Sequence, residues 1–430
     1  MSQADWDRLQ YYSRKINVFV VADDGDNDPL IHPSTYVRIA QLQSSALFPS
    51  LRHLHYRLED SSKSHIFLFL SPLLDSISLD NIRGFETTVV GPFLATLSSP
   101  VLRRIDLRSG QMSVDTFKTS ILHFKQLRTL ELLDAVFMSD FDLWKVLGTI
   151  PSLANLNLDI DPSCHPAHDP ENSNGQSGDP KYFVALETLY ITGSFFLIQH
   201  LLGFIDSPYL KSLSLYPVIE RQQENEPEDL LTPSMTIVVS KWSQSLKKLN
   251  IGTSTLYLRR NGFPNRNPKL LTLLSGLHEI QIFNLWGWRL ENYNDAMKRL
   301  AMSWPKLRHL GNDASNQNFI SLSVLRAIAE NCPDLRRLHI QLDTSTIPPF
   351  DDISTKSFRH NLEVLIVKEL GDPGDHQPDA INEPMLESQI RVARHLDFIF
   401  PYLKTIEVWE QKWSGIRNLV KVFQDVRRCQ

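Results

Sequence analysis

The chain has 430 residues, 42% of them hydrophobic and 22% charged, which is the balance of a globular protein with enough apolar material for a large core. Its net charge of −5 at pH 7 argues against binding to nucleic acid or to an anionic membrane surface. The three cysteines are scattered, and the sequence has neither an apolar run of about 18 residues nor a signal-peptide pattern. We therefore expect no disulfide framework, no membrane span and a cytoplasmic or nuclear location.

The N-terminal segment 1–22 predicts a short helix from about residue 4, followed by a strand at 18–21. Trp6 and Leu9 of that helix should face inward, together with Ile16 after it. A stacked array of repeats needs such a segment, because its first unit would otherwise expose apolar surface. We therefore expect residues 1–22 to form an N-terminal cap made of a helix and a first strand.

A pattern of the form Leu-x-x-Leu-x-Leu recurs about thirteen times within residues 23–410, at a mean spacing of about 29 residues. The first leucine of each copy is Leu51, Leu74, Leu102, Leu127, Leu153, Leu186, Leu210, Leu246, Leu277, Leu307, Leu335, Leu362 or Leu403. In the copy "LRRLHIQL", Leu335, Leu338 and Ile340 alternate with polar residues, as in a half-buried strand. One such strand cannot bury its apolar face alone, so the copies are expected to stack as neighbouring parallel strands.

The segments between these strands change to a helical period. In "NDAMKRLAMSW", Met297, Leu300 and Trp304 fall on one face of a helix. The segments "VDTFKTSILHF" and "SLSVLRAIAENCP" carry similar stripes, which include Phe117 and Ile328. A strand and a helix in each repeat predict an α/β leucine-rich-repeat solenoid, an arc of parallel strands on the concave side with helices on the convex side.

Three insertions rich in Pro, Gly, Asp, Asn and Glu interrupt the repeats, at 160–180, 217–233 and 371–388. The repeats resume after each insertion. We therefore expect exposed loops on a single solenoid domain that spans residues 23–410. Whether these loops become ordered when a partner binds is left open by the sequence.

The C-terminal segment "WSGIRNLVKVFQDV" predicts an amphipathic helix. Ile416 and Val420 lie on its apolar face, and Ser414 is a suitable N-cap. We expect residues 411–430 to form a C-terminal capping helix, because the last repeat also needs a cover for its apolar side.

The stretch "DWDRLQYYSRKINVFV", with Trp6, Tyr11 and Ile16, is followed by repeats of the form P-x-L-x-x-L-x-L. Together they resemble the C-terminal part of fungal F-box and leucine-rich-repeat proteins, especially those of mushroom-forming fungi, over essentially the whole chain. The resemblance implies the substrate-recognition part of an SCF-type ubiquitin-ligase receptor, whose ligand is a protein.

The F-box of that family, a helical segment that begins with a Leu-Pro pair, has no counterpart before Asp5. The resemblance therefore implies a Skp-type adaptor as a partner only if an F-box is encoded upstream of Met1. Residues 1–430 alone are not expected to bind the adaptor.

The sequence contains no G-x-S-x-G, P-loop, helix-opening G-x-G-x-x-G or H-E-x-x-H motif. We therefore expect no catalytic residue, no cofactor, no metal and no enzymatic activity. A metal-dependent enzyme is kept as an alternative by "CHPAHD", which groups Cys164, His165, His168 and Asp169. The cluster falls in a loop without a second ligand pair at zinc spacing, which favours a solvated loop.

Two further groups have a structural and a functional interpretation. Cys332 lies on the apolar face of a predicted helix, which favours a buried and inert thiol over a reactive one. The segment "NLWGWRLENY" groups Trp286, Trp288 and Tyr293, which are either core side chains or an exposed aromatic patch for a partner.

The outward positions of the strands are the main candidates for binding, because a curved sheet presents them in rows on a rigid backbone. They include His53, His55, Arg57, Arg104, Asp106, Arg108, Glu131, Asn155, Asn157, Asp159, Thr188, Tyr190, Ser212, Ser214, Tyr216, Lys248, Asn250, Glu279, Phe283, His309, Arg337, His339, Lys368, Glu407 and Trp409. Their signs are mixed, whereas a surface that tracks phosphates needs a basic stripe.

We expect the partner-binding site in the middle of the array, where aromatic, amide and charged side chains come together. Its predicted residues are Asn155, Asn157, Asp159, Tyr190, Tyr216, Lys248 and Asn250. Tyr190 and Tyr216 should lie about 5 Å apart, on strands one repeat apart. The predicted ligand is a protein or peptide on the concave face. A ubiquitin-independent scaffold with the same fold is the alternative to a ligase receptor.

Overall fold

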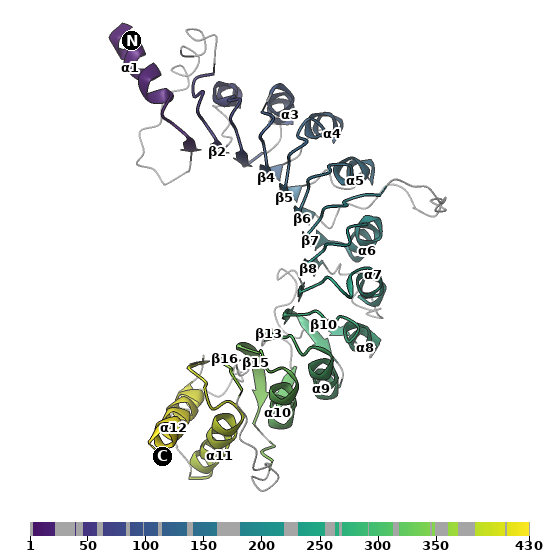
Figure 1. The fold of residues 1–430 in the computed structure, drawn as a ribbon, viewed down its shortest axis with the longest axis vertical. Helices are drawn as coiled ribbons and strands as arrows, with labels where there is room; N and C mark the ends of the chain where they lie inside the picture. Colours follow the sequence, from purple (N-terminus) through teal and green to yellow (C-terminus); the bar gives the residue numbers. More distant parts are fainter. Residues whose placement is uncertain are drawn as a thin grey trace. The chain divides into compact units, whose positions relative to one another are not determined.

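The computed structural model of the chain describes residues 3–21, 39, 46–57, 63–82, 87–97, 99–110, 114–135, 141–160, 181–218, 231–253, 263–265, 269–290, 292–312, 318–344, 346–348, 360–368, 383–408 and 411–429. The contacts between its elements gather in two compact units, Met1–Leu210 and Lys211–Gln430 (Figure 1). We call them unit 1 and unit 2 and describe each by itself.

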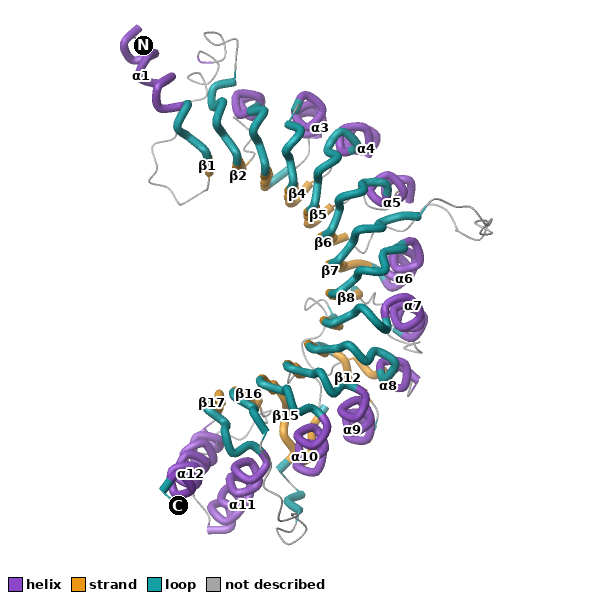
Figure 2. The backbone as a smooth tube through the Cα atoms, in the orientation of Figure 1, coloured by secondary structure: helices purple, strands orange, loops and turns teal. Residues whose placement is uncertain are grey.

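Unit 1 contains a parallel sheet whose strands follow one another in chain order. The strands are β1 (Val18–Val21), β2 (His53–Arg57), β3 (Ser76–Asp80), β4 (Arg104–Gly110), β5 (Thr129–Ala135), β6 (Asn155–Ile160) and β7 (Thr188–Gly193). The helices are α1 (Gln3–Ser13), the 3-10 helix η1 (Lys63–Phe69), α3 (Thr87–Thr96), α4 (Val114–Ile121), α5 (Phe141–Gly148) and α6 (Phe195–Phe204). Within the unit, the strands lie on the inner side of the curve and α3 to α6 on its outer side (Figure 2).

Unit 2 repeats this arrangement. Its main parallel strands, in sheet order, are β8 (Ser212–Pro217), β9 (Lys248–Ile251), β11 (Ile282–Leu285), β13 (His309–Asn312), β15 (Arg337–Asp343), β16 (Val364–Lys368) and β17 (Thr405–Val408). The short β14 (Phe319–Ser321) also pairs with β15, and β10 (Phe263–Asn265) pairs with β12 (Trp288–Leu290). The helices are α7 (Thr232–Trp242), α8 (Lys269–Leu274), α9 (Tyr293–Ser303), α10 (Leu322–Asn331), α11 (Glu383–Ile399) and α12 (Gln411–Arg428).

The leucines that start the repeats lie in the core, as the sequence predicts. All thirteen of them are at most 4% exposed. In most repeats the strand begins two residues after that leucine, as Arg104 follows Leu102. In most repeats, one backbone carbonyl oxygen accepts hydrogen bonds from two successive N–H groups of the next repeat. The Arg103 carbonyl oxygen accepts from Arg128 at 2.8 Å and from Thr129 at 2.9 Å. This repeated geometry keeps the parallel strands in register.

One repeat has a different register from the predicted one. Leu277 is buried, but β11 begins only at Ile282. Phe283 pairs with Leu249 of β9, which is the second leucine of the pattern in the preceding repeat. Ile280, three residues before Phe283, therefore takes the place of the first leucine of the pattern. The pair of backbone hydrogen bonds agrees, because the Lys247 carbonyl oxygen accepts from Gln281 at 2.7 Å and from Ile282 at 3.0 Å. The repeat therefore has three more residues before its strand than the sequence pattern suggests.

This shift corrects two outward positions. Phe283, which we expected on the outward face, is 1% exposed and packs against the ring of Trp304, with ring centroids 4.8 Å apart. Glu279 lies before the strand, where it pairs with Lys306 at 2.6 Å. Asn284 takes the outward position instead. With these strands and helices, each unit has the fold of a leucine-rich-repeat solenoid.

The helices bury the stripes that the sequence predicts. On α9, Met297 and Leu300 are at most 1% exposed, and Trp304 directly after the helix is fully buried. Phe117 of α4 and Ile328 of α10 are buried in the same way. The helices α4, α9 and α10 therefore cover the apolar side of the sheet in their own unit. The outward side chains lie on the opposite side of the sheet.

The two terminal helices differ in how well they are covered. In α1 only Ser13 is buried, and Trp6, Leu9 and Ile16 are half-buried. In α12, Trp413, Ile416 and Val420 are at most 1% exposed. Because α12 begins at Gln411, Ser414 lies inside the helix and is not its N-cap.

One hydrogen bond shows how α12 closes the last repeat. Inside the array, the carbonyl oxygen of the repeat leucine accepts from a serine of the next repeat, as Leu127 does from Ser152 Oγ at 2.8 Å. The Leu403 carbonyl oxygen accepts from Gln424 Nε2 of α12 at 3.0 Å. A helix side chain thus takes the position of a following repeat. The division into a cap at 1–22, a solenoid at 23–410 and a cap at 411–430 stays a prediction.

Among the described residues, no helix is both long enough and apolar enough to cross a membrane.

Candidate partner-binding surface

The outward side chains of each unit form rows across its sheet, because neighbouring strands pair in register. In unit 1 the central row runs through His55, Ser78, Asp106, Glu131, Asn157 and Tyr190. In unit 2 the central row runs through Ser214, Asn250, Asn284, Gly311, His339, Ile366 and Glu407. We call these outward surfaces the strand face of unit 1 and the strand face of unit 2.

The predicted site residues of unit 1 lie on adjacent strands of its strand face. They are Asn155, Asn157 and Asp159 on β6 and Tyr190 on β7, and all are half-buried. Hydrogen bonds fix the two amides: Asn155 Nδ2 donates to Thr129 Oγ1 at 3.2 Å, and Asn157 Nδ2 donates to Glu131 Oε2 at 3.5 Å. Glu131 also accepts from Arg104 at 2.5 Å. These side chains are therefore ordered before any partner arrives.

The remaining charges on the strand face of unit 1 compensate one another. Arg108 pairs with Asp106 at 3.0 Å and with Asp80 at 3.6 Å. Asp80 also lies 3.4 Å from His55. The hydrogen bonds that Arg108 donates to the Asp106 carboxylate are the main cause that raises the pKa of Arg108. Asp106 is only 3% exposed, so its charge is neutralised within the face and is not presented to solvent.

The strand face of unit 2 has a ladder of buried amides in its central row. Asn284 Nδ2 donates to Asn250 Oδ1 at 2.7 Å, and Asn250 Nδ2 donates to Ser214 Oγ at 2.8 Å. The ladder ends beside Gly311, where an added Cβ would collide with Asn284 Oδ1. Asn250 is a predicted site residue. Asn284 was missed, because the predicted register assigned its place to Phe283.

An aromatic pair lies next to this ladder. Tyr216 is the residue before the last one of β8, and its ring lies over the backbone of Gly252, where an added Cβ would come within 2.5 Å of Tyr216 Cε1. The ring of Trp286 lies beside it, with ring centroids 6.1 Å apart. Both aromatic side chains are half-buried, so each keeps part of its ring open to solvent. Such rings are frequent anchors at protein interfaces.

Basic side chains follow along the outer row of the same face. Lys248, Ile282, His309 and Arg337 pair in register on successive strands, and His339 follows Arg337 on β15. Burial lowers the pKa of His309, and the charges of Arg337, His339 and Lys248 lower it further. Lys248 is a predicted site residue; the sequence pattern also marked the other three basic residues as outward without assigning them to the site.

Tyr190 and Tyr216 fall in different units, so their predicted spacing of about 5 Å stays a prediction. The assignment of the seven site residues to partner binding also stays a prediction.

The other candidate residues have structural roles or lie outside the described residues. Trp288 and Tyr293 are at most 6% exposed, so of that aromatic group only Trp286 reaches the surface. Cys332 is fully buried, and burial raises the pKa of its thiol to about 12, so it is inert as predicted.

The metal-like cluster of the 160–180 loop, Cys164 to Asp169, lies outside the described residues. Among the residues that are described, no group of three or more His, Cys, Asp or Glu side chains is placed to hold a metal ion.

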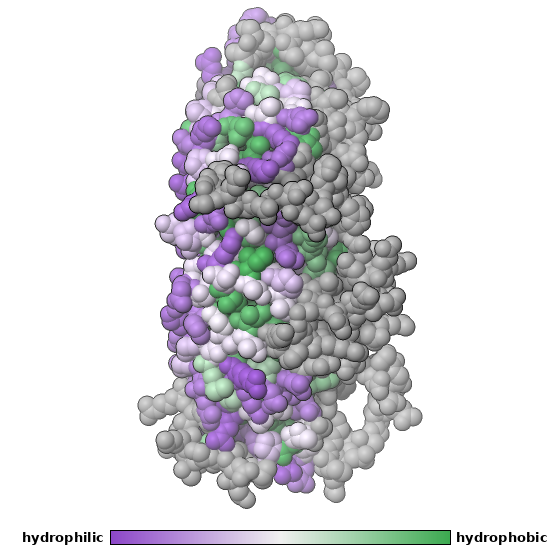
Figure 3. Space-filling view, turned by 90° about the vertical axis from the view of Figure 1, so that its right-hand side faces the viewer, coloured by the Kyte–Doolittle hydropathy of each residue, from purple (hydrophilic) through white to green (hydrophobic). Residues whose placement is uncertain are grey.

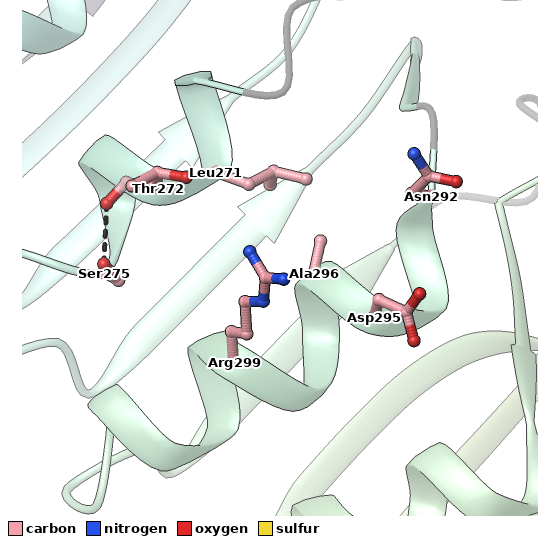
Figure 4. A pocket seen from close by; sticks show the side chains of 7 residues that line it. All are labelled: Leu271, Thr272, Ser275, Asn292, Asp295, Ala296 and Arg299. Atoms are coloured by element: carbon pink, nitrogen blue, oxygen red, sulfur yellow. Dashed lines mark hydrogen bonds between the residues drawn. The ribbon is translucent and has the colours of Figure 1, made fainter.

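A pocket of about 300 Å³ lies on the helix side of unit 2, between α8 and α9 (Figure 4). Its lining residues are Leu271, Thr272, Ser275, Asn292, Asp295, Ala296 and Arg299. Asp295 and Arg299 are both exposed, and Ser275 Oγ donates to the Thr272 carbonyl oxygen of its own helix. Four of its lining residues, Thr272, Asn292, Asp295 and Arg299, are exposed, so the pocket is an open depression, which does not favour a catalytic site.

The helix side shows mixed polarity. In Figure 3, which includes the helix side of unit 1, hydrophobic residues stand in small groups among hydrophilic ones. Phe196 of α6 is 44% exposed and stacks on His200, with ring centroids 6.2 Å apart.

No family model matches the sequence, and no curated protein matches it. Solved structures with a similar fold include an internalin from Listeria monocytogenes, with 14% identity over 95% of this chain and 86% of that chain and a TM-score of 0.40. The Rad7 and Elc1 complex in yeast has 13% identity over 89% and 93%, with a TM-score of 0.42. The leucine-rich repeat-containing protein LegL7 from Legionella pneumophila has 15% identity over 66% and 89%, with a TM-score of 0.38. At these scores, the assignment of the fold rests on the strand register and core of the chain itself.

Proposed function

We propose that this chain is a leucine-rich-repeat module that binds a protein or peptide through its strand faces. The observation that carries this proposal is the order of the outward side chains. Amide ladders, ion pairs and the Tyr216–Trp286 pair hold them in place before binding. A surface that is already ordered loses little side-chain entropy on association, and this favours affinity and specificity.

The proposed anchors are the seven predicted residues, each within its own unit. In unit 1 they are Asn155, Asn157, Asp159 and Tyr190; in unit 2 they are Tyr216, Lys248 and Asn250. Trp286 and Asn284 extend the second set, since they contact Tyr216 and Asn250. The two tyrosines should contribute most to affinity, because aromatic side chains have large contact areas and few rotatable bonds.

We further propose that the module recognises substrates for an SCF-type ubiquitin ligase in the cytoplasm or nucleus. The support is the resemblance of the segment around Trp6, Tyr11 and Ile16, and of the repeats after it, to fungal F-box proteins. A Skp-type adaptor would bind an upstream F-box and not the repeats.

Affinity capture from the cells that express the protein tests the binding surface. A Tyr190→Ala, Tyr216→Ala double variant should keep its fold but bind the captured partner about 30-fold more weakly, which corresponds to about 2 kcal/mol. A Phe196→Ala, Met302→Ala variant is the matched control, because both residues are exposed on helices, one in each unit. Equal affinity of the tyrosine variant and the wild type would rule out the strand faces.

Protein turnover tests the ligase role separately. Deleting the gene should lengthen the half-life of the captured partner, and the Tyr190, Tyr216 double variant should not restore its degradation. A partner that needs the two tyrosines for binding but whose half-life stays constant would make the chain a ubiquitin-independent scaffold.

A further inference from the structure

The basic residues on the strand face of unit 2 differ from those of unit 1 in their pairing with acidic side chains. Among the described residues, no ion pair or hydrogen bond joins Lys248, His309 or Arg337 to an acidic side chain. In unit 1, Arg104 pairs with Glu131 and Arg108 pairs with Asp106. Within the part of the chain that the structure describes, positive charge is thus paired with acidic side chains in unit 1, whereas Lys248, His309 and Arg337 of unit 2 have no such partner.

The geometry concentrates this charge in a small area. His309 and Arg337 are register partners on adjacent strands, about 5 Å apart at the backbone, and Lys248 lies two strands away, at about 10 Å. The ring of His309 leans over Gly311, since its Nε2 lies 3.6 Å from where a Cβ of Gly311 would be. The space beside the Gly311 backbone is filled by Asn284 Oδ1 and the ring of His309, so His309 is held next to the amide ladder.

Two acidic residues, Glu279 and Glu363, precede the strands β11 and β16 of the same sheet and are engaged elsewhere. Glu279 pairs with Lys306 at 2.6 Å, and Glu363 pairs with Lys404 at 3.3 Å. Burial is the main cause that lowers the pKa of His309, and the positive charges of Arg337, His339 and Lys248 lower it further. An anion between these side chains would offset the positive charges of Lys248 and Arg337 and would favour the protonated ring of His309.

We propose that the strand face of unit 2 binds an acidic protein segment, whose carboxylates lie between Lys248, His309 and Arg337 while an apolar side chain packs on Tyr216 and Trp286. This inference rests on the proposed function and names the chemistry of its partner. The amide ladder of Ser214, Asn250 and Asn284 runs between the two sets, where its side chains hydrogen-bond one another.

The net charge of the whole chain makes this attraction selective. The chain carries −5 at pH 7, so an acidic segment gains little from the long-range field of the protein. Attraction therefore depends on the local cluster, within about 10 Å at moderate salt. A segment that lacks an aromatic or aliphatic residue in reach of Tyr216 would bind by charge alone and would be released at high salt.

Peptide binding to the complete chain tests the inference, with fluorescence anisotropy as the readout. The probe is a labelled peptide in which glutamates flank a single tryptophan, and the comparison peptide has glutamine at each glutamate. We expect the glutamate peptide to bind at least tenfold more tightly, and we expect a Lys248→Glu, Arg337→Glu variant to remove that preference. A Lys248→Gln, Arg337→Gln variant gives an intermediate loss and covers the case in which charge reversal disturbs folding.

A matched control reverses the same amount of charge away from the strand face. Arg299 of α9 and Lys421 of α12 are both exposed on helices of unit 2. The Arg299→Glu, Lys421→Glu variant should bind the glutamate peptide as the wild type does. Equal weakening in the two charge-reversed variants would overturn the proposal, because the attraction would then come from overall charge.

Two further outcomes would also overturn it. One is equal binding of the glutamate and glutamine peptides. The other is binding only when the peptide carries a phosphate, which would assign the site to phosphoryl groups and not to carboxylates. If captured partners still depend on Tyr190 and Tyr216 while the glutamate peptide does not bind, the inference fails and the proposed function stands.

Discussion

His360 shows how one side chain joins neighbouring repeats in unit 2. It is 3% exposed, and its Nδ1 accepts from the N–H group of Leu362 at 3.1 Å. Its Nε2 therefore carries the proton and donates to the Cys332 carbonyl oxygen at 2.8 Å. Burial lowers the pKa of His360, and the hydrogen bond to Cys332 opposes this as the smaller effect. The folded chain thus favours the neutral ring.

This predicts a loss of stability in mild acid. Because the native pKa lies below about 6.5, the unfolded chain binds more protons between the native pKa and pH 6.5. The contribution of His360 is complete above about pH 6.5 and is lost as the pH falls through the native pKa. A His360→Ala variant should lose part of this pH dependence. It should also be less stable at pH 7 by about 2 kcal/mol, since the Cys332 carbonyl loses its donor. Urea unfolding between pH 5 and 8 measures both the pH dependence and the loss of stability. If the variant kept the pH dependence of the wild type, the assignment of that dependence to His360 would be wrong.

Gly311 allows a second prediction at this scale. An added Cβ would collide with Asn284 Oδ1, the end of the amide ladder. A Gly311→Ala variant should therefore lose about 1–3 kcal/mol of stability as Asn284 is displaced. Gly203 of α6 is the matched control, since no atom lies within 4 Å of its added Cβ. Gly203→Ala should be neutral or slightly stabilising because alanine is the better helix former. Equal thermal shifts in the two variants would show that the ladder is not rigid.

At the scale of the element, β11 shows where sequence periodicity becomes ambiguous. Two overlapping sets satisfy the repeat pattern, one from Leu277 through Ile280 to Ile282 and one from Ile280 through Phe283 to Leu285. Periodicity alone does not choose between them. Pairing with β9 selects the second set, because only that register places the large ring of Phe283 against Trp304 in the core. One signal in the sequence could have identified this register. The tripeptide "Phe-Asn-Leu" of β11 has the same order of apolar residue, Asn and apolar residue as "Leu-Asn-Ile" of β9.

Alanine substitutions test this register. Phe283→Ala should destabilise unit 2 by about 3–5 kcal/mol, since it empties a buried site. Ile282→Ala, at a half-buried outward position, should cost about 1 kcal/mol. Chemical unfolding of the two variants gives the comparison. A larger loss for Ile282→Ala than for Phe283→Ala would restore the register that begins at Leu277.

At the scale of the whole molecule, most contacts join elements that are neighbours in the chain. Strands pair with the strands of adjacent repeats, and helices pack on adjacent helices, as α9 does on α10. Stability in such an array is a sum of repeat terms and nearest-neighbour terms. Damage in one repeat should therefore spread to its neighbours and weaken with distance along the chain.

Leu338 provides the test. It is fully buried on β15, and Leu338→Asp should destabilise unit 2 by several kcal/mol, because it buries a carboxylate without a partner. Hydrogen exchange should increase most in β13, β15 and β16, while β3 to β5 of unit 1 stay protected. Met302→Asp, at a residue 63% exposed on α9, should leave both units unchanged. A uniform increase over both units would indicate a single cooperative unfolding step.

Sequence patterns alone predicted the repeat, its length, the thirteen buried leucines and most outward positions. These follow from local periodicity, because a two-residue alternation in strands and a 3.6-residue period in helices set which side chains face a core. The site residues Asn155, Asn157 and Tyr190 could therefore be placed on an outward face from their spacing alone.

The tertiary structure decided what lies beside each outward residue. Whether Asp106 is neutralised by Arg108, whether Asn284 extends the ladder of Asn250, and whether Trp286 meets Tyr216 all depend on pairing between repeats about 30 residues apart. The same is true of the positive charge around His309, which has no acidic partner among the residues that the structure describes. Local periodicity fixes the side of the sheet on which a side chain lies. Only the register between strands fixes its neighbours, and charge and affinity depend on those neighbours.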